Sequence, residues 1–153
     1  MKDELAGLLK SFIAFKSTAE SQIQKQECID WISATFLGEE FSHSKRGVFD
    51  KSPWMYLPNP DSKLLVFAHV DVVPAAETQF ALQVDGDKLI GRGTSDMKGN
   101  ILPFLMAFRD ASNAGEKPPV SLLITTDEEV GGLTIPHLLD EGLFSEPAAF
   151  TPD

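Results

Sequence analysis

The sequence is poor in cysteine and in long apolar runs. Cys28 is the only cysteine among 153 residues, so a disulfide within the chain is excluded. Its position between Ile23 and Ile32 favours a buried helix face, and a reducing cytoplasm is the expected location. No apolar run approaches the roughly 20 residues of a membrane span. Residues 1–5 open with charges, which disfavours a secretory signal.

Basic residues are also scarce. There are 13 lysines and arginines against 23 acidic residues, which gives a formal net charge of −10 at pH 7. Nucleic acid and anionic membranes both require a basic face, so neither is an expected partner. A small molecule or a metal ion fits this charge better. The length is that of one domain with a real hydrophobic core.

Apolar periodicity predicts two amphipathic helices at the beginning of the chain. Leu5, Leu8 and Ile13 recur at helical spacing, and residues 23–36 repeat the pattern. Further helices are predicted over 97–112 and 135–143. Pro103 is tolerable only in the first turns of its helix or as a kink.

The predicted strands lie at residues 64–68, 120–124 and 148–150. The first two are apolar without alternation, as expected of strands covered on both faces. Residues 39–57 are ambiguous between a short strand and a hairpin, and residues 74–90 between a loop and a small hairpin. The β-α-β-α-β order predicts an α/β fold with a mostly parallel, doubly wound sheet and helices on both faces.

A histidine and an aspartate follow the first of these strands. His69 and Asp71 are two residues apart on an extended segment, so their side chains leave on the same face. This spacing suits a metal-binding imidazole that is oriented by a carboxylate. A strand-end histidine beside a turn aspartate is the alternative.

The run from Gly91 to Gly99 reads Gly-Arg-Gly-Thr-Ser-Asp-Met-Lys-Gly. Its glycines allow unusual backbone angles, and Thr94 or Ser95 is predicted to cap the following helix. Asp96 would then lie at a helix N-terminus, where its two oxygens can each bind one of two metals. A plain N-terminal helix acid is the alternative. Arg92 and Lys98 are interpreted as structural or solvated.

A pair of glutamates follows the second strand. Glu128 and Glu129 would project in opposite directions from an extended segment, so that one can bind metal while the other faces the attacking water. A solvated acidic loop is the alternative reading of this pair alone.

Together the three segments predict a metal site, because they occur in the order and at the strand ends that one site needs. They resemble the dinuclear zinc amidohydrolases that include acetylornithine deacetylase, succinyl-diaminopimelate desuccinylase, aminoacylase, carboxypeptidases and related dipeptidases. The Gly91–Gly99 run is the most specific part of the resemblance.

This resemblance implies a zinc-exopeptidase-like catalytic domain that hydrolyses amide bonds in N-acyl amino acids or short peptides. A complete site would hold two Zn²⁺ ions, with Co²⁺ or Mn²⁺ as substitutes. His69 would bind one metal, Asp96 would bridge the two, and Glu129 would bind the other. Glu128 would be the general base and acid, and Asp71 would orient His69. The Asp96–Met97 peptide bond is a candidate for the cis form.

The resemblance also implies one further carboxylate ligand. Asp153 lies 24 positions after Glu129 and follows the predicted strand 148–150, which matches the expected placement. In some relatives the ligand lies a few residues beyond a Pro-Asp pair, so a residue beyond Asp153 remains the alternative.

Members of the family are usually more than twice as long as this sequence. They carry a smaller dimerisation domain and a later catalytic segment with a last histidine ligand. Residues 1–153 are therefore expected to be the N-terminal portion of the catalytic domain, and the parent protein a homodimer. His43 and His137 are expected to have solvated or core roles. A truncated, non-catalytic relative that binds one metal or a partner is the alternative.

Overall fold

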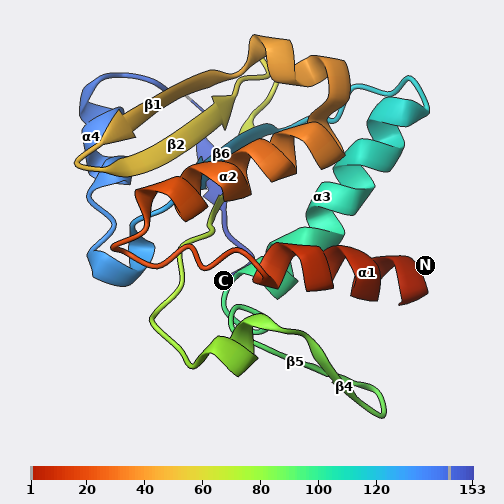
Figure 1. The fold of residues 1–153 in the computed structure, drawn as a ribbon. Helices are drawn as coiled ribbons and strands as arrows, with labels where there is room; N and C mark the ends of the chain where they lie inside the picture. Colours follow the sequence, from red (N-terminus) through yellow and green to blue (C-terminus); the bar gives the residue numbers. More distant parts are fainter. Residues whose placement is uncertain (1, 145) are drawn as a thin grey trace.

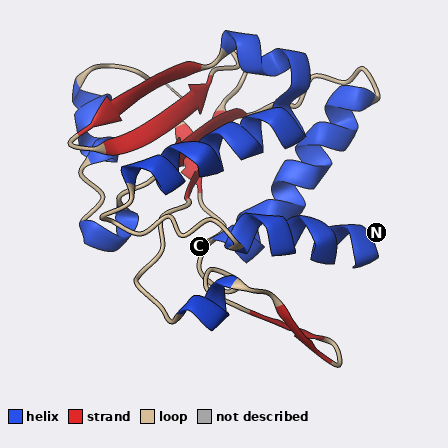
Figure 2. Ribbon diagram, viewed as in Figure 1, coloured by secondary structure: helices blue, strands red, loops and turns tan. Residues whose placement is uncertain are grey.

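The computed structural model describes residues 2–144 and 146–153. Its helices and strands are arranged as Figures 1 and 2 show. The helices are α1 (Lys2–Ile13), α2 (Gln22–Ile32), α3 (Lys98–Asn113) and α4 (Thr134–Asp140). The strands are β1 (Lys45–Phe49), β2 (Ser52–Leu57), β3 (Leu64–His69), β4 (Gln83–Asp85), β5 (Lys88–Ile90), β6 (Ser121–Thr125) and β7 (Ala148–Phe150). Among the described helices, none is long and apolar enough to cross a membrane.

Five strands form the central sheet in the order β1-β2-β6-β3-β7. Strand β3 lies between β6 and β7 and runs parallel to both. The chain passes from β3 through α3 to β6, and then through α4 to β7 on the other side of β3. The strand order therefore reverses at β3, as in a doubly wound sheet, and the predicted α/β fold is confirmed.

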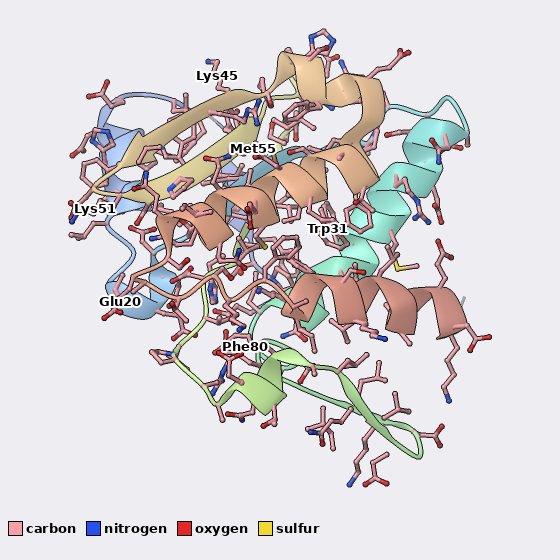
Figure 3. All side chains as sticks on the ribbon, in the orientation of Figure 1. Glu20, Trp31, Lys45, Lys51, Met55 and Phe80 are labelled. Atoms are coloured by element: carbon pink, nitrogen blue, oxygen red, sulfur yellow. The ribbon has the colours of Figure 1, made fainter. Side chains whose placement is uncertain are left out.

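Helices cover both faces of this sheet. On one face α1, α2 and α3 pack against alternate strand residues, including Met55, Leu122 and Ile124. Figure 3 shows Trp31 of α2 on this face, and its ring centroid lies 5.1 Å from that of Phe12 in α1. On the other face Leu138 of α4 packs with Tyr56, Leu65 and Leu123. Strands β3 and β6 are largely buried between these layers, which explains their continuous apolar sequences, whereas β7 at the sheet edge is exposed.

The ambiguous segment 39–57 contains a hairpin. Strands β1 and β2 are antiparallel, and β2 continues the sheet antiparallel to β6. The turn residues Asp50 and Lys51 have φ angles of 42° and 65°. Two successive left-handed residues give the twist that a two-residue hairpin needs. Residues 38–43 form a 3₁₀ turn ahead of the hairpin.

Two further predictions are settled by local structure. Residues 74–90 contain a 3₁₀ turn, Glu77–Phe80, and the small hairpin β4–β5. Helix α4 ends at Asp140, earlier than the predicted residue 143, because Gly142 adopts a left-handed φ of 66°.

Pro103 lies in the second turn of α3. Cys28 is fully buried, and burial raises the pKa of its thiol to about 11.

Candidate metal centre

His69 ends the central strand β3 and is 3% exposed. Its Nδ1 atom lies 3.3 Å from Oδ1 of Asp71 and 3.2 Å from the backbone oxygen of the same residue. Its Nε2 atom lies 3.1 Å from Oδ1 of Asp96. One ring nitrogen therefore faces a buried carboxylate, and the other faces the proposed ligands.

Asp71 is fully buried and joins the ends of two neighbouring strands. Its Oδ1 and Oδ2 atoms accept hydrogen bonds from the backbone N–H groups of Glu128 and Glu129, at 3.2 and 3.0 Å. The sequence pattern alone links Asp71 only to His69. The parallel pairing of β3 and β6, with His69 opposite Thr125, brings these segments together. Asp71 thus fixes the glutamate turn as well as the histidine ring.

The loop that carries Asp96 is held by tight backbone contacts. Gly93 has a φ of 89°, and the Gly99 N–H donates to the Gly93 carbonyl at 2.9 Å. The Asp96–Met97 peptide bond is cis, as the resemblance implied. The predicted capping by Thr94 or Ser95 is wrong. Met97 is the N-cap of α3 and makes no side-chain cap bond.

Thr94 does not cap α3, because its hydroxyl has another partner. Its hydroxyl donates to the Gly91 carbonyl at 2.9 Å, within the loop itself. The Ser95 carbonyl instead accepts from the side-chain amide of Asn100, at 2.8 Å. The hydrogen bonds of both residues therefore stabilise the loop that precedes α3.

Glu128 and Glu129 lie in a 3₁₀ turn, Glu128–Val130, and not on the predicted extended segment. The turn forms because the Gly131 and Gly132 N–H groups close back onto Glu128 and Asp127. Oε2 of Glu128 lies 4.0 Å from Nε2 of His69, and its side chain is exposed. Glu129 is half-buried. Burial and the nearby charge of Asp96 raise the pKa of Glu129, against smaller opposing effects of His69 and the Val73 backbone.

Asp153 follows β7 and also reaches the histidine. Its Oδ2 atom lies 3.8 Å from Nε2 of His69. Because β3 and β7 are parallel neighbours, their carboxyl ends meet where the strand order reverses. Ligands of open α/β sheets bind outside the carboxyl ends of strands at this point.

Three of the four predicted ligands converge in the structure. Single ligand atoms from His69, Asp96 and Asp153 all lie within 4.8 Å of one another. Among the described residues, Glu129 is not part of this close group, although its carboxyl group feels the charge of Asp96. The group joins one imidazole with carboxylate oxygens, which suits zinc, cobalt or manganese.

The electrostatic setting of His69 is acidic. Burial by itself would lower the pKa of the imidazole, but the hydrogen bond and charge of Asp71, with the charges of Glu128 and Asp153, raise that pKa to about 9. Such a concentration of negative charge around one imidazole favours a bound cation.

The other two histidines lie elsewhere. His43 is exposed at the end of a 3₁₀ turn. His137 of α4 stacks on Phe49 of β1, with ring centroids 4.1 Å apart. Neither belongs to the close ligand group within the described chain. Their expected solvated and packing roles agree with these positions.

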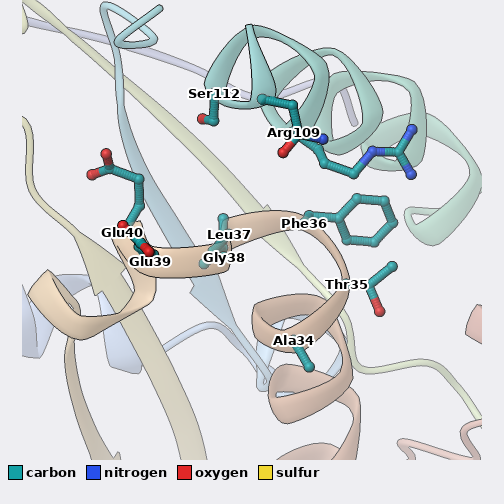
Figure 4. Close-up of a pocket in the computed structure, with 10 residues that line it drawn as sticks. Ala34, Thr35, Phe36, Leu37, Gly38, Glu39, Glu40, Arg109 and Ser112 are labelled. Atoms are coloured by element: carbon teal, nitrogen blue, oxygen red, sulfur yellow. The ribbon is translucent and has the colours of Figure 1, made fainter. Parts of the chain in front are cut away.

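A pocket of about 510 Å³ lies between the C-terminal half of α3 and the π-helical turn Ser33–Leu37. Figure 4 shows Arg109 and Ser112 on one side of it and Phe36 on the other. None of the predicted site residues lines this pocket. Arg109 is already paired with Glu4 and Asp110. The candidate metal centre therefore lies outside this pocket.

Comparison with known proteins agrees with this geometry. Residues 65–151 match the profile of Peptidase family M20/M25/M40. The chain belongs to this family. The predicted resemblance is thereby confirmed.

Individual relatives match only part of their own length. A probable carboxypeptidase of Aspergillus terreus is 35% identical over 89 residues, which cover 58% of this chain and 21% of the relative. A succinyl-diaminopimelate desuccinylase of Gluconobacter oxydans is 48% identical over 71 residues, covering 42% of this chain and 19% of the relative. This chain therefore spans about a fifth of the length of these curated relatives.

A solved structure extends the likeness over the fold. Human carnosine dipeptidase 1 superimposes with a TM-score of 0.76 at 19% sequence identity. The alignment covers 97% of this chain and 38% of that protein. At this identity the match shows a shared fold.

Proposed function

We propose that this chain provides the N-terminal part of the active site of a metal-dependent hydrolase that cleaves amide bonds in N-acyl amino acids or short peptides. The observation that carries the proposal is the convergence of His69, Asp96 and Asp153 within 4.8 Å at the carboxyl ends of β3 and β7. Glu128 lies beside this group, with its Oε2 atom 4.0 Å from the histidine Nε2. The family match supports the same chemistry.

The donor set fits zinc. One buried imidazole and several carboxylate oxygens form a borderline-to-hard ligand set. In the proposed centre His69, Asp96 and Asp153 would hold one Zn²⁺, and Glu129 together with Asp96 would hold a second. A bound zinc pair supplies Lewis-acid polarisation of the scissile carbonyl and makes water a better nucleophile at neutral pH. A complete dinuclear centre needs a further histidine ligand, which the family supplies from a later segment.

The proton transfers fall to Glu128. Its exposed carboxylate takes a proton from the attacking water and returns it to the leaving amine nitrogen. Asp71 does not contact substrate in this scheme. It orients His69 through Nδ1 and fixes the turn that carries Glu128 through the backbone N–H bond at 3.2 Å.

Substitution of Glu128 tests this assignment. In the complete protein, Glu128→Gln should retain metal but lose about 10²- to 10⁴-fold in kcat, the usual contribution of a general base. Glu141→Gln, at the exposed end of α4, is the matched control and should keep full activity. The assay is zinc-dependent release of amine from a panel of N-acetyl and N-succinyl amino acids and dipeptides. A Glu128→Gln enzyme with undiminished kcat would refute the role of Glu128.

A non-catalytic metal-binding chain is the second candidate. It is favoured by the ligand count, since two catalytic zincs need about six protein contacts, and His69, Asp153, Glu129 and an Asp96 counted twice would supply five. The same panel separates the two candidates. Stoichiometric zinc binding without turnover on any substrate, by the complete protein, would favour this second function. For the complete protein we also propose a cytoplasmic location and a homodimeric assembly.

A further inference from the structure

Lys98 is a fully buried lysine at the first position of α3. Its Nζ atom donates to the backbone carbonyls of Phe15, at 2.8 Å, and Phe12, at 3.3 Å. The Phe12 carbonyl belongs to the last turn of α1, where carbonyls have no partner within the helix. Lys98 therefore joins the end of α1 to the beginning of α3.

The same side chain forms the inside of the loop that carries Asp96. A Cβ atom on Gly93 would lie 3.2 Å from Cδ of Lys98, so the lysine stem packs directly against the loop backbone. The Gly99 N–H closes the loop onto the Gly93 carbonyl at 2.9 Å. The loop thus turns around the Lys98 stem.

Asp96 has little packing of its own. Its carboxylate contacts Nε2 of His69, yet the side chain remains 60% exposed. Met97, which follows it, is fully buried. The position of the carboxylate therefore depends on the backbone of the loop, and so on what holds residues 97 and 98.

We propose that Lys98 is a positioning residue for Asp96, because its amino group ties the Gly93–Gly99 loop to the carbonyl end of α1. This inference rests on the proposed function, in which Asp96 binds metal. Lys98 acts through the backbone and touches neither metal nor substrate.

The chemistry of the buried amino group supports this role. An apolar side chain such as methionine would fill the same volume without the cost of burying a polar group. Burial lowers the pKa of Lys98. Both the charged and the neutral amine have at least two N–H donors, one for each carbonyl. The lysine is therefore suited to hold two fixed acceptors in either form.

The experiment compares Lys98→Met with wild type by two measurements. Hydrogen exchange of the metal-free protein reports on the loop, through amides such as Gly99 N–H. Titration with Co²⁺, followed by visible absorbance, reports on the metal site. Leu105→Ala is the matched control, since Leu105 is fully buried in α3 without belonging to the loop. Lys98→Arg tests rescue by a side chain that retains N–H donors.

In Lys98→Met we expect exchange at residues 93–99 to become about tenfold faster than in wild type, while β6 stays protected. The Kd for Co²⁺ should rise about 10- to 100-fold, the usual effect of losing an outer support of a ligand. Leu105→Ala should lower the melting temperature without either selective effect. Lys98→Arg should recover part of the exchange protection at residues 93–99 and part of the Co²⁺ affinity. Lys98→Leu, which also lacks N–H donors and should show the same two effects, is the second variant, should Lys98→Met not fold.

Wild-type exchange at residues 93–99 together with wild-type Co²⁺ affinity in folded Lys98→Met would overturn the inference. A failure of the proposed metal centre looks different, because wild type itself would then bind no Co²⁺, and a failure of the hydrolase activity alone leaves both measurements unchanged. In that case the exchange data alone decide whether Lys98 fixes the loop.

Discussion

Asp71 holds the backbone of Glu129, whose N–H group donates to Oδ2 of the aspartate at 3.0 Å. The same carboxylate lies against Nδ1 of His69. A single buried side chain therefore sets the relative position of two candidate metal ligands, one at the end of β3 and one in the turn that follows the neighbouring strand β6.

Substitution of Asp71 by asparagine should affect both ligands. Asp71→Asn removes the charge beside His69 and one of the two acceptors of the glutamate turn. We expect the pKa of His69 to fall from about 9 toward or below 6.5, and the protein to lose about 1.5–3 kcal/mol of stability, the usual worth of hydrogen bonds to a charged group. NMR titration of the imidazole in chelator and urea unfolding measure the two effects. Asp140→Asn removes a charge on exposed α4 and should change neither.

The raised pKa of His69 also predicts a pH dependence of the metal-free protein. The pKa is about 9 in the folded chain and near 6.5 when the chain is unfolded. The imidazolium therefore stabilises the fold fully below pH 6.5, and this contribution is lost as the pH rises through 9. Urea midpoints in chelator should fall over this interval in wild type and in His43→Gln, but less in His69→Gln. An equal fall in all three would contradict the assignment.

Metal binding should show a different response to substitution at each ligand. His69→Gln and Asp96→Asn remove members of the close group and should weaken zinc binding at least about tenfold. Glu129→Gln should leave the tight site nearly unchanged, because Glu129 lies outside that group. For these 153 residues, calorimetric titration should give about one tight zinc per chain, since a second closed site needs further ligands. Two tight sites would show that the ligand set is incomplete as described.

Two glycines should respond in opposite directions to alanine. A Cβ atom at Gly99 would lie 2.0 Å from the Thr94 carbonyl oxygen, whereas nothing lies within 4 Å of one at Gly7. Both residues are helical, so alanine gains about 1 kcal/mol from helix propensity at each. At Gly7 this gain should appear as higher stability. At Gly99 the steric clash should outweigh it, lowering the melting temperature and zinc affinity together. A Gly99→Ala chain that binds zinc as tightly as wild type would refute the importance of this close approach.

The strands and the ligand segments can be predicted from the sequence for clear physical reasons. Residues 64–68 and 120–124 are covered by helices on both faces, and strands in that position need apolar side chains pointing both ways. Their continuous apolar runs therefore indicate parallel strands. His69 directly follows the first run, the glutamate pair lies shortly after the second, and parallel strands bring these ends together. Which ligand roles these residues take stays a prediction.

Other features depend on contacts that no local pattern reveals. The Asp50–Lys51 turn has two left-handed residues but neither glycine nor asparagine, the usual signals of such a hairpin. Thr94 has the residue type of a helix cap, but α3 begins later, at Lys98, and the Thr94 hydroxyl bonds within the loop. The hydrogen bonds from the Glu128 and Glu129 N–H groups to Asp71 span sequence separations of 57 and 58 positions. Only the folded sheet creates that proximity.

The spacing of the close ligand group along the chain has a thermodynamic consequence. His69 and Asp96 are 27 positions apart, and Asp153 belongs to a third segment, after β7. An unfolded chain holds these donors far from one another, so an ion bound by all three binds essentially only the folded state. Free metal at about 100 times its Kd would then add roughly 2.7 kcal/mol to the free energy of unfolding. In such a protein the bound ion stabilises the whole domain against unfolding, and a chelator removes that part of the stability.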